Sequence, residues 1–398
     1  MPLLILLSLS AAAGFQFAAA EDWPNWRGPR FDGVSNEKLP DKLPDEPSVV
    51  WKAKVGTGFS TVSVARGRVF TMGNANGTDT VWCLDAATGE LIWKHDYPCE
   101  LDPLYYEGGP GATPTVHGDS VFTLSKKGHA FRLNFETGAV RWSRDLVGDH
   151  GFELPEWSFA SSPFIFEERI ILNVGGAGTA LDYETGRTIW KSSEKPSGYA
   201  TAVPFHRNDK PELILFVAKE VIGLDPLTGR VAWSFASECS RNVNAADPVV
   251  SGNRFMISSS VGAVCLEVGP GANPTPTVIW ETKKLRTYFN PTVRVGDHLF
   301  ALHGTTHRPT ELVCLDWKTG ETRWNEPGFG SGALMAAPDR LILFDNGELT
   351  IFPANAERFE PLTRSQILSG KCWTVPVWSN DRIYCRNAEG DLACVALR

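Results

Sequence analysis

The sequence predicts an all-β protein, an eight-bladed β-propeller of four-stranded antiparallel blades, because one motif and one strand pattern recur along the chain. The motif is Leu-Asp-x-x-Thr-Gly-x-x-x-Trp, with looser copies in which Asn or Glu replaces Asp. Its tryptophans lie 43 to 49 residues apart, which is typical of propeller blades when each unit holds several short strands. The six copies end at Trp93, Trp142, Trp190, Trp233, Trp280 and Trp324.

Each unit contains four apolar or alternating runs separated by turns of Gly, Asn and Asp, which is the pattern of antiparallel strands. In the first unit these runs cover residues 60–65, 68–72, 80–84 and 91–94. The same order of runs begins again at Thr113, Ser162, Ala202, Asp247 and Pro291. The first six units therefore have the complete pattern of a blade.

The last two units depart from this pattern. The seventh starts near Leu334 and has lost both the Thr-Gly turn and the tryptophan, while the eighth starts at Trp373 and reaches Arg398 without an outer strand. The segment 49–52, Val-Val-Trp-Lys, has the pattern of that missing strand, so we expect it to complete the eighth blade and close the ring. A ring of seven blades is the alternative, if the seventh unit forms no blade of its own.

The motif residues have a structural explanation. The Asp side chain accepts hydrogen bonds from turn amides, and Gly supplies a position with positive φ, so the chain reverses into an outer strand. A Trp at the start of that strand can lie flat against the neighbouring blade and keep its N–H for a partner. We therefore expect seven tryptophans to dock blades together: Trp51, Trp93, Trp142, Trp190, Trp233, Trp280 and Trp324.

The N-terminus predicts export. Residues 1–20 carry no charged side chain, include the apolar run 3–7 and end in three alanines, which fits a secretory signal peptide. We expect an extension over residues 21–48 and the propeller over 49–398, in a periplasmic or secreted protein. No later stretch approaches the roughly 20 apolar residues of a membrane helix.

Net charge and cysteine content limit the classes of partner and the disulfides that the sequence allows. The formal net charge is −8 and no block of Lys or Arg occurs, which argues against a nucleic-acid partner. Four of the eight cysteines share one repeat position and are expected to be buried apolar side chains: Cys83, Cys265, Cys314 and Cys394. The sequence leaves open whether two of Cys99, Cys239 and Cys372 form a disulfide. We expect a monomer.

The repeat resembles the pyrroloquinoline-quinone (PQQ) repeat, and the chain resembles the PQQ-like β-propeller family. That repeat is shared by quinoprotein alcohol dehydrogenases and by the non-enzymatic propeller of the outer-membrane protein assembly factor BamB. The segments 23–29 (WPNWRGP), 156–163 (EWSFASSP) and 370–376 (GKCWTVP) resemble signatures of secreted PQQ-like propellers of planctomycete-type bacteria. Such a resemblance is specific for the fold and poorly specific for function.

The candidate site is the rim of the central channel. Loops that precede innermost strands meet at one mouth of the channel, whereas the Thr-Gly turns lie on the opposite face. Aromatic, cationic and amide groups there suit a protein or extended-peptide partner, or a small anionic or sugar-like ligand. The expected rim residues are Glu107, Glu156, Trp157, Arg241, Asn244, Arg286, Tyr288, Asn290, Lys371 and Trp373.

The resemblance also implies an enzymatic alternative, a PQQ- and calcium-dependent alcohol dehydrogenase. Those enzymes hold PQQ over a Trp, use a calcium ion with carboxylate and amide ligands, and employ an Asp as base. Oxygen ligands for a calcium ion are available on Glu107, Glu156, Asn244, Asn290 and Asp247, but no spacing singles them out. The chain is shorter than those enzymes and lacks the adjacent cysteines that many of them place beside the cofactor. We therefore expect a non-catalytic binding or scaffold protein, without assigned catalytic residues or metal ligands.

Overall fold

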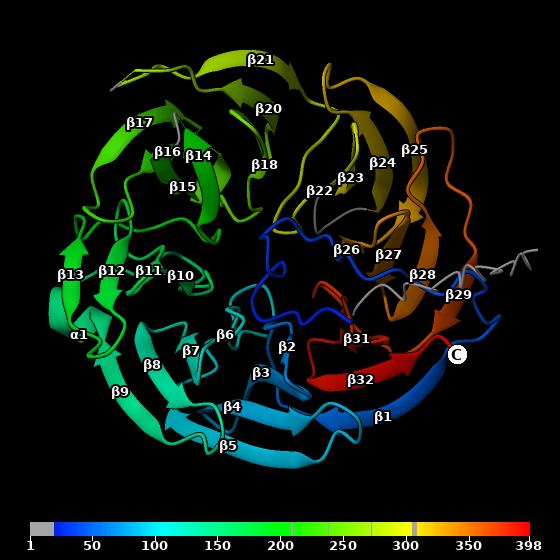
Figure 1. Ribbon diagram of the computed structural model, residues 1–398, viewed down its shortest axis with the longest axis horizontal. Coiled ribbons are helices and arrows are strands. Elements are labelled where there is room, and N and C mark those ends of the chain that lie inside the picture. Colours follow the sequence, from blue (N-terminus) through cyan, green and yellow to red (C-terminus); the bar gives the residue numbers. More distant parts are fainter. Residues whose placement is uncertain (1–19, 208–209, 238, 272, 305–308) are drawn as a thin grey trace, which may run out of the picture.

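Eight four-stranded antiparallel sheets surround a central axis in the part of the chain that the structure describes (Figure 1). The structure is a computed structural model, and it describes residues 20–207, 210–237, 239–271, 273–304 and 309–398. The predicted eight-bladed propeller is confirmed, and the seven-bladed alternative is wrong because the seventh unit forms its own sheet. The predicted signal peptide, apart from Ala20, lies outside the described residues.

Seven blades are built from four consecutive strands, with the first strand of each blade nearest the axis. The first blade contains β2 (Ser63–Ala65), β3 (Arg68–Ala75), β4 (Thr78–Asp85) and β5 (Leu91–Pro98). The second contains β6 (Thr115–His117), β7 (Ser120–Leu124), β8 (His129–Asn134) and β9 (Val140–Asp145). The third contains β10 (Phe164–Phe166), β11 (Arg169–Leu172), β12 (Thr179–Asp182) and β13 (Thr188–Lys191).

The fourth to seventh blades repeat this arrangement. The fourth contains β14 (Val203–Arg207), β15 (Lys210–Phe216), β16 (Glu220–Leu224) and β17 (Val231–Ala236). The fifth contains β18 (Val249–Ser251), β19 (Arg254–Ser259), β20 (Gly262–Glu267) and β21 (Thr277–Thr282). The sixth contains β22 (Val293–Val295), β23 (His298–His303), β24 (Thr310–Asp316) and β25 (Thr322–Phe329). The seventh contains β26 (Ala333–Ala336), β27 (Arg340–Asp345), β28 (Glu348–Pro353) and β29 (Thr363–Gln366).

The eighth blade closes the ring with strands from both ends of the propeller. It contains β30 (Val377–Ser379), β31 (Arg382–Arg386), β32 (Asp391–Ala396) and, outermost, β1 (Ser48–Lys54). Strand β1 pairs antiparallel with β32, and Trp51 stands opposite Cys394. The predicted closure is therefore confirmed.

Helical structure is minor in the described residues. One short α-helix, α1 (Leu146–His150), follows β9, and one 3₁₀ turn, η1 (Ser240–Asn242), lies in the loop before β18. Among the described residues, no helix is both long and apolar enough to cross a membrane.

The docking role of the repeat tryptophans is visible in one repeated contact. The indole N–H of Trp142 donates to the backbone oxygen of Tyr183 at 3.0 Å, in the turn of the next blade. Its ring lies against Gly186, where an added Cβ would stand 2.7 Å from the ring. The glycine therefore serves both the turn, at φ 67°, and the close approach of the indole. Equivalent N–H donations to the next blade come from Trp51, Trp93, Trp190, Trp280 and Trp324.

Trp233 is the exception. Its N–H donates to Glu212 Oε2 at 2.9 Å, within its own blade, and its ring stacks on Phe255 of the next blade at 5.3 Å between centroids. In the next blade, Glu267 leads into a longer turn without Thr-Gly. The missing Thr-Gly alone does not account for the exception, because Trp324 still donates to Asn355 O in the seventh blade, which also lacks it. Trp190 and Trp324 make the contact with the next blade but remain partly exposed.

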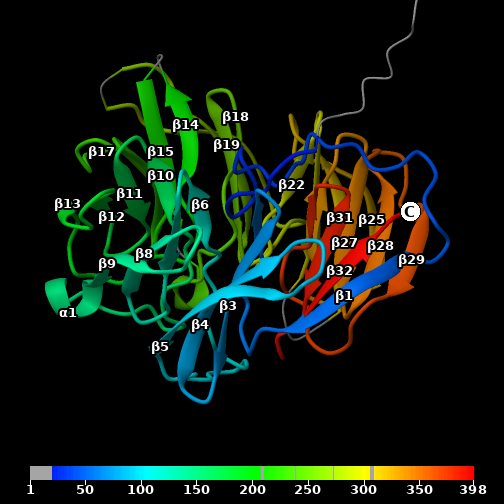
Figure 2. The same ribbon diagram turned by 60° about the horizontal axis from the view of Figure 1, so that its bottom comes forward.

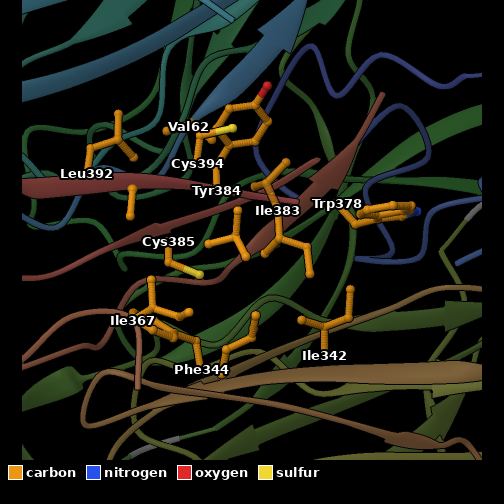
Figure 3. Close-up of a cluster of buried hydrophobic side chains, with 14 of the residues drawn as sticks. Val62, Ile342, Phe344, Ile367, Trp378, Ile383, Tyr384, Cys385, Leu392 and Cys394 are labelled. Carbon is orange, nitrogen blue, oxygen red and sulfur yellow. The ribbon is translucent and has the colours of Figure 1, made fainter. Parts of the chain in front are cut away.

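The hydrophobic core lies between neighbouring blades rather than at one centre. Figure 3 shows Ile342 and Phe344 of β27 near Ile383 and Cys385 of β31, in a buried cluster that joins the last two blades to the first. All eight cysteines are free thiols, so the disulfide left open in the sequence does not form. The four repeat cysteines are buried, and each faces a docking tryptophan across strands, as Cys83 faces Trp93.

The segment 20–47 crosses the middle of the disc before it reaches β1 (Figures 1 and 2). Trp23 forms a β-bridge with Val64, and Pro24 accepts a hydrogen bond from Val116 N at 2.7 Å. The segment contacts the innermost strands β2, β6, β10, β26 and β30. It also bonds to the turn after β30, where Asp381 N donates to Glu37 at 2.6 Å. Because that turn lies at the far end of an innermost strand, the segment fills the channel from the face opposite the predicted rim.

Candidate functional site

A cavity of about 410 Å³ lies at the mouth of the channel, where chains enter the innermost strands. Its wall is formed by loops from several blades, and its floor by the N-terminal segment. We call it the aromatic well, after its ten aromatic residues: Trp26, Phe59, Tyr105, Tyr106, Trp157, Phe159, Tyr199, Tyr288, Phe289 and Trp373. A pocket of this size and composition can enclose a compact ligand.

Five of the ten predicted rim residues line the aromatic well: Trp157, Arg241, Tyr288, Asn290 and Trp373. Each lies in a loop that precedes an innermost strand, so the positional argument from the sequence applies to them. Asn290 also fixes the wall, because its amide donates to Ser331 O at 2.9 Å in the next blade.

Three further predicted residues lie outside the lining and form ion pairs at the mouth. Glu156 pairs with Arg241, and Lys371 pairs with Glu107 at 2.8 Å. Each pair joins two loops that are not neighbours in the ring, the first across the fourth blade and the second across the first. The Lys371 ammonium lies 4.4 Å from the centre of the Trp373 ring. These pairs hold the loops at the mouth and neutralise the cations there.

The remaining two predicted residues lie elsewhere. Asn244 is fully buried, and its amide donates to Val217 O at 2.8 Å, which fixes the loop before β18. The backbone N–H of Arg286 donates to His303 at 2.9 Å, and its side chain lies outside the lining. Sequence position placed both in entry loops, but the direction of a side chain depends on the loop fold.

The floor of the aromatic well is built around one buried carboxylate. Asp247 accepts hydrogen bonds from the Trp26 indole and, at 2.7 Å, from Thr201 N. Arg27 lies 3.9 Å from Asp247, and both side chains are 2% exposed. Burial raises the pKa of Asp247, while Arg27 and the hydrogen bonds from Trp26 and Thr201 oppose that rise. The Arg27 guanidinium also donates to Thr292 O at 2.9 Å, so it ties the segment to the sixth blade.

Hydrogen bonds run from blade to blade along the wall. Thr113 N donates to Ser162 Oγ at 2.9 Å, and Ser162 N donates to Thr201 Oγ1 at 2.9 Å. Thr201 N then donates to Asp247, which connects this belt to the floor. Amides that would otherwise face the channel are thereby satisfied inside the protein.

The aromatic side chains of the wall contact one another. Phe59 lies 5.5 Å from Trp373 and 5.4 Å from Tyr106, and Phe289 lies 4.8 Å from Trp373, between ring centroids. These are normal separations for tilted aromatic pairs, which pre-organise the wall. Burial raises the pKa values of Tyr106 and Tyr199 to about 12, so both phenols stay neutral near pH 7.

Sequence reasoning missed several residues of the aromatic well. Phe59 and Phe289 sit in the entry loops already considered, but as apolar residues they were not weighed as site residues. Trp26 lies in the N-terminal segment, and the sequence gives no signal that this segment enters the channel. Phe159 belongs to the segment 156–163, which the resemblance had singled out.

The groups present do not fit a calcium–PQQ pair. In the described part of the chain, no three His, Cys, Asp or Glu side chains stand together so that they could hold a metal ion. Asp247, the carboxylate of the aromatic well, is already engaged by Trp26, Thr201 and Arg27. A calcium ion in a protein needs six to eight oxygen ligands. The carboxylates of PQQ would also need cations, and Arg241 is already paired with Glu156.

Most of the propeller matches a known protein family. Residues 44–145 and 101–326 match the family model described as "Outer membrane protein assembly factor BamB".

Three curated relatives illustrate the divergence within this group. The chain is 23% identical over 384 residues to an outer membrane protein assembly factor BamB of Shewanella oneidensis, covering 88% of this chain and 89% of the relative. It is 34% identical over 262 residues to a polyvinylalcohol dehydrogenase of a Sphingopyxis species, covering 59% of this chain. The chain spans only 35% of that dehydrogenase, and 24% of a second one from a Pseudomonas species.

Solved structures show the same fold in both groups. BamB of Moraxella catarrhalis matches with a TM-score of 0.63 at 16% identity, covering 88% of this chain and 98% of that one. A quinohemoprotein alcohol dehydrogenase of Comamonas testosteroni matches with a TM-score of 0.69 at 13% identity, covering 96% and 81%. At this identity the likeness concerns the fold alone.

Proposed function

The chain belongs to the PQQ-like β-propeller family, and from that premise we propose that it is a non-catalytic binding protein whose binding site is the aromatic well. One observation carries this proposal. The aromatic well is the place where loops from around the ring and the N-terminal segment converge on one open, mainly aromatic cavity. Aromatic and arginine side chains at the centre of a surface are the residues that most often dominate binding.

A BamB-like scaffold role agrees with the shape of the molecule. A relative that this chain matches over most of its length is named for outer-membrane protein assembly, which supports a protein partner. On this proposal the protein is exported after removal of residues 1–20 and works as a monomer in the periplasm. Its rigid disc presents the mouth of the channel, and the partner inserts a compact group into the aromatic well.

Dehydrogenase activity is the alternative that the relatives raise. A PQQ cofactor supplies oxidation chemistry when it is bound, and it would have to lie between aromatic rings of the aromatic well. The paired cations and the engaged Asp247 argue against it. We expect that PQQ added with calcium changes neither the absorbance spectrum nor the thermal midpoint. A stoichiometric complex with a raised midpoint would support the enzyme instead.

Site-specific crosslinking tests the proposal. A photoreactive amino acid replaces Tyr288 inside the aromatic well or, as a matched control, Glu321 on the face of the Thr-Gly turns. After irradiation in the native envelope, we expect a discrete adduct from position 288 and none from position 321. Adducts from position 321 alone would place the binding site on the opposite face and refute the proposal.

A further inference from the structure

We infer that the occupant of the aromatic well is an uncharged saccharide, bound end-on through the face of its sugar ring. This inference rests on the proposed function, because it names the ligand class of the same cavity. It depends on the charge, the shape and the surface of the aromatic well.

The aromatic well offers a ligand no unpaired charge among its described residues. Arg241 is paired with Glu156, and the nearby Lys371 is paired with Glu107. At the floor, Asp247 is paired with Arg27. A charged ligand would lose its hydration on entering and would have to break one of these pairs to regain an ionic partner. An uncharged ligand avoids both costs.

The shape favours a compact ligand over an extended one. Trp26 closes the bottom, so a chain cannot thread through the channel from the mouth. The wall residues precede the innermost strands, and the amides of Ser162 and Thr201 are already bonded to side chains. An extended peptide binds along a free strand edge, which this wall does not offer. A ligand therefore enters with one end.

The surface combines flat apolar faces with polar atoms at their edges. Trp157, Trp373 and Tyr288 line the aromatic well from three loops. Among the described residues, none accepts a hydrogen bond from the indole N–H of Trp157 or Trp373. Sugar rings have the complementary pattern, because one face presents C–H groups that pack on aromatic rings and the rim carries hydroxyls that pair with N–H and phenol groups. A volume of about 410 Å³ is enough for a small saccharide or the last units of a glycan.

The test is a binding screen on the whole mature protein. A panel of neutral mono- and oligosaccharides, the corresponding uronic acids and short apolar peptides is titrated by calorimetry and tryptophan fluorescence. We expect at least one neutral saccharide to bind, with its uronic acid weaker. Monosaccharides and oligosaccharides form separate arms, which distinguish a free sugar from the end of a glycan.

Two variants link the binding to the aromatic well. Trp157→Ala should weaken the neutral saccharide by about tenfold or more, and Trp157→Phe should retain part of the affinity. Trp324→Phe is the matched control, because Trp324 docks two blades far from the mouth, and it should leave the affinity unchanged.

The binding screen and the crosslinking at position 288 together separate the saccharide inference from the proposed function. Binding confined to uronic acids or to peptides would overturn the saccharide inference. If no saccharide binds while the photoreactive group at position 288 still captures a partner, the inference fails and the proposed function stands. If both experiments are negative, the aromatic well is not a binding site and both proposals fall.

Discussion

The repeat motif couples neighbouring blades through single residues, because one indole ring and one glycine meet at five of the eight junctions. The ring of Trp142 leaves no room for a side chain on Gly186, and its N–H is matched by Tyr183 O. The motif is a pattern within each repeat, but the Trp and Gly that lie side by side in space come from two neighbouring repeats. Trp233 is the exception, since its indole N–H bonds to Glu212 of its own blade instead.

Replacement of a docking tryptophan should lower the stability of the whole ring. Trp142 is 8% exposed, so Trp142→Ala is expected to cost about 3–5 kcal/mol in the free energy of unfolding, as buried large-to-small changes do. Trp190→Ala should cost less, because Trp190 is partly exposed. Urea unfolding measures both. Unchanged midpoints for the two variants would show that these side chains do not hold the blades together.

Acid should destabilise the turns through their aspartates. The Thr185 hydroxyl, more than the Thr185 amide, holds the pKa of Asp182 below its usual value. A carboxyl with a lowered folded-state pKa contributes stability above its unfolded pKa of about 3.9, and this contribution is lost as the pH falls through the folded pKa. The thermal midpoint of Asp182→Asn should therefore fall less below about pH 4 than that of the parent protein. Asn134 shows that an amide makes the same turn bonds, since it accepts from Thr137 N at 3.0 Å. Parallel acid profiles would contradict this role for Asp182.

At the scale of elements, the ring is closed by more than the pairing of β1 with β32. Arg386, at the end of β31, is fully buried and donates to Ser60 O and Met72 O at 2.6 Å and to Gly56 O at 2.9 Å. These acceptors lie in and before the first blade, so one side chain joins the last blade to the first. Burial lowers the pKa of Arg386 to about 9. A buried cation usually has a carboxylate partner. Here three backbone carbonyl groups and the Thr71 hydroxyl accept hydrogen bonds from Arg386 in that place.

Loss of this side chain should weaken the closure. Arg386→Met keeps much of the volume but leaves several buried carbonyl groups unpaired, and each costs about 1–3 kcal/mol. We expect a drop of at least about 3 kcal/mol in the free energy of unfolding, with native circular dichroism retained at low temperature. Arg382→Met, on the same strand but with a partly exposed side chain, is the control. Equal stability of the two variants would remove Arg386 from the closure.

The strands were largely predictable, because the apolar alternation and the turn residues act within each blade. The innermost strands were predicted too long: the run 60–65 contains β2 only over Ser63–Ala65. The physical reason is that the residues before these strands make hydrogen bonds that hold the entry loops in place. Ser60 accepts from Met72 N through its hydroxyl, and Thr61 donates to Val375 O at 2.6 Å. The first bond lies within the first blade and the second joins it to the eighth, and neither leaves a signature in local periodicity.

At the scale of the whole molecule, the N-terminal segment converts a ring with a channel into a disc with a blind cavity. The buried pair of Arg27 and Asp247 joins the segment to the ring and sets the floor. Five of the ten predicted rim residues line the aromatic well. The repeat fixes which loops reach the mouth, but the fold of each loop decides where its side chains point, as Asn244 shows by donating to Val217 O. The floor depends on the contact of Trp26 with Asp247, which lie more than 200 residues apart in the chain.

Breaking the ion pair between Arg27 and Asp247 should lower the free energy of unfolding. Arg27→Ala leaves a buried carboxylate without a counter-charge and is expected to cost about 3–5 kcal/mol. Adding Asp247→Asn should recover a large part of the loss, since the amide oxygen still accepts from Thr201 N. Unfolding of the two single variants and the double variant measures the coupling. Additive losses would mean that the two side chains do not depend on each other.

The central claim is that the molecule binds at the aromatic well, and paired variants on the two faces test it most directly. Capture of the native partner from envelope extracts is compared for Trp157→Ala/Tyr288→Ala at the mouth and for Glu90→Ala/Glu321→Ala near the Thr-Gly turns, with the thermal midpoint measured alongside. The account predicts that the first variant loses capture while its midpoint changes little, and that the second retains both. Loss of capture in the second variant with retention in the first would contradict it, because the binding face would then be the one with the turns.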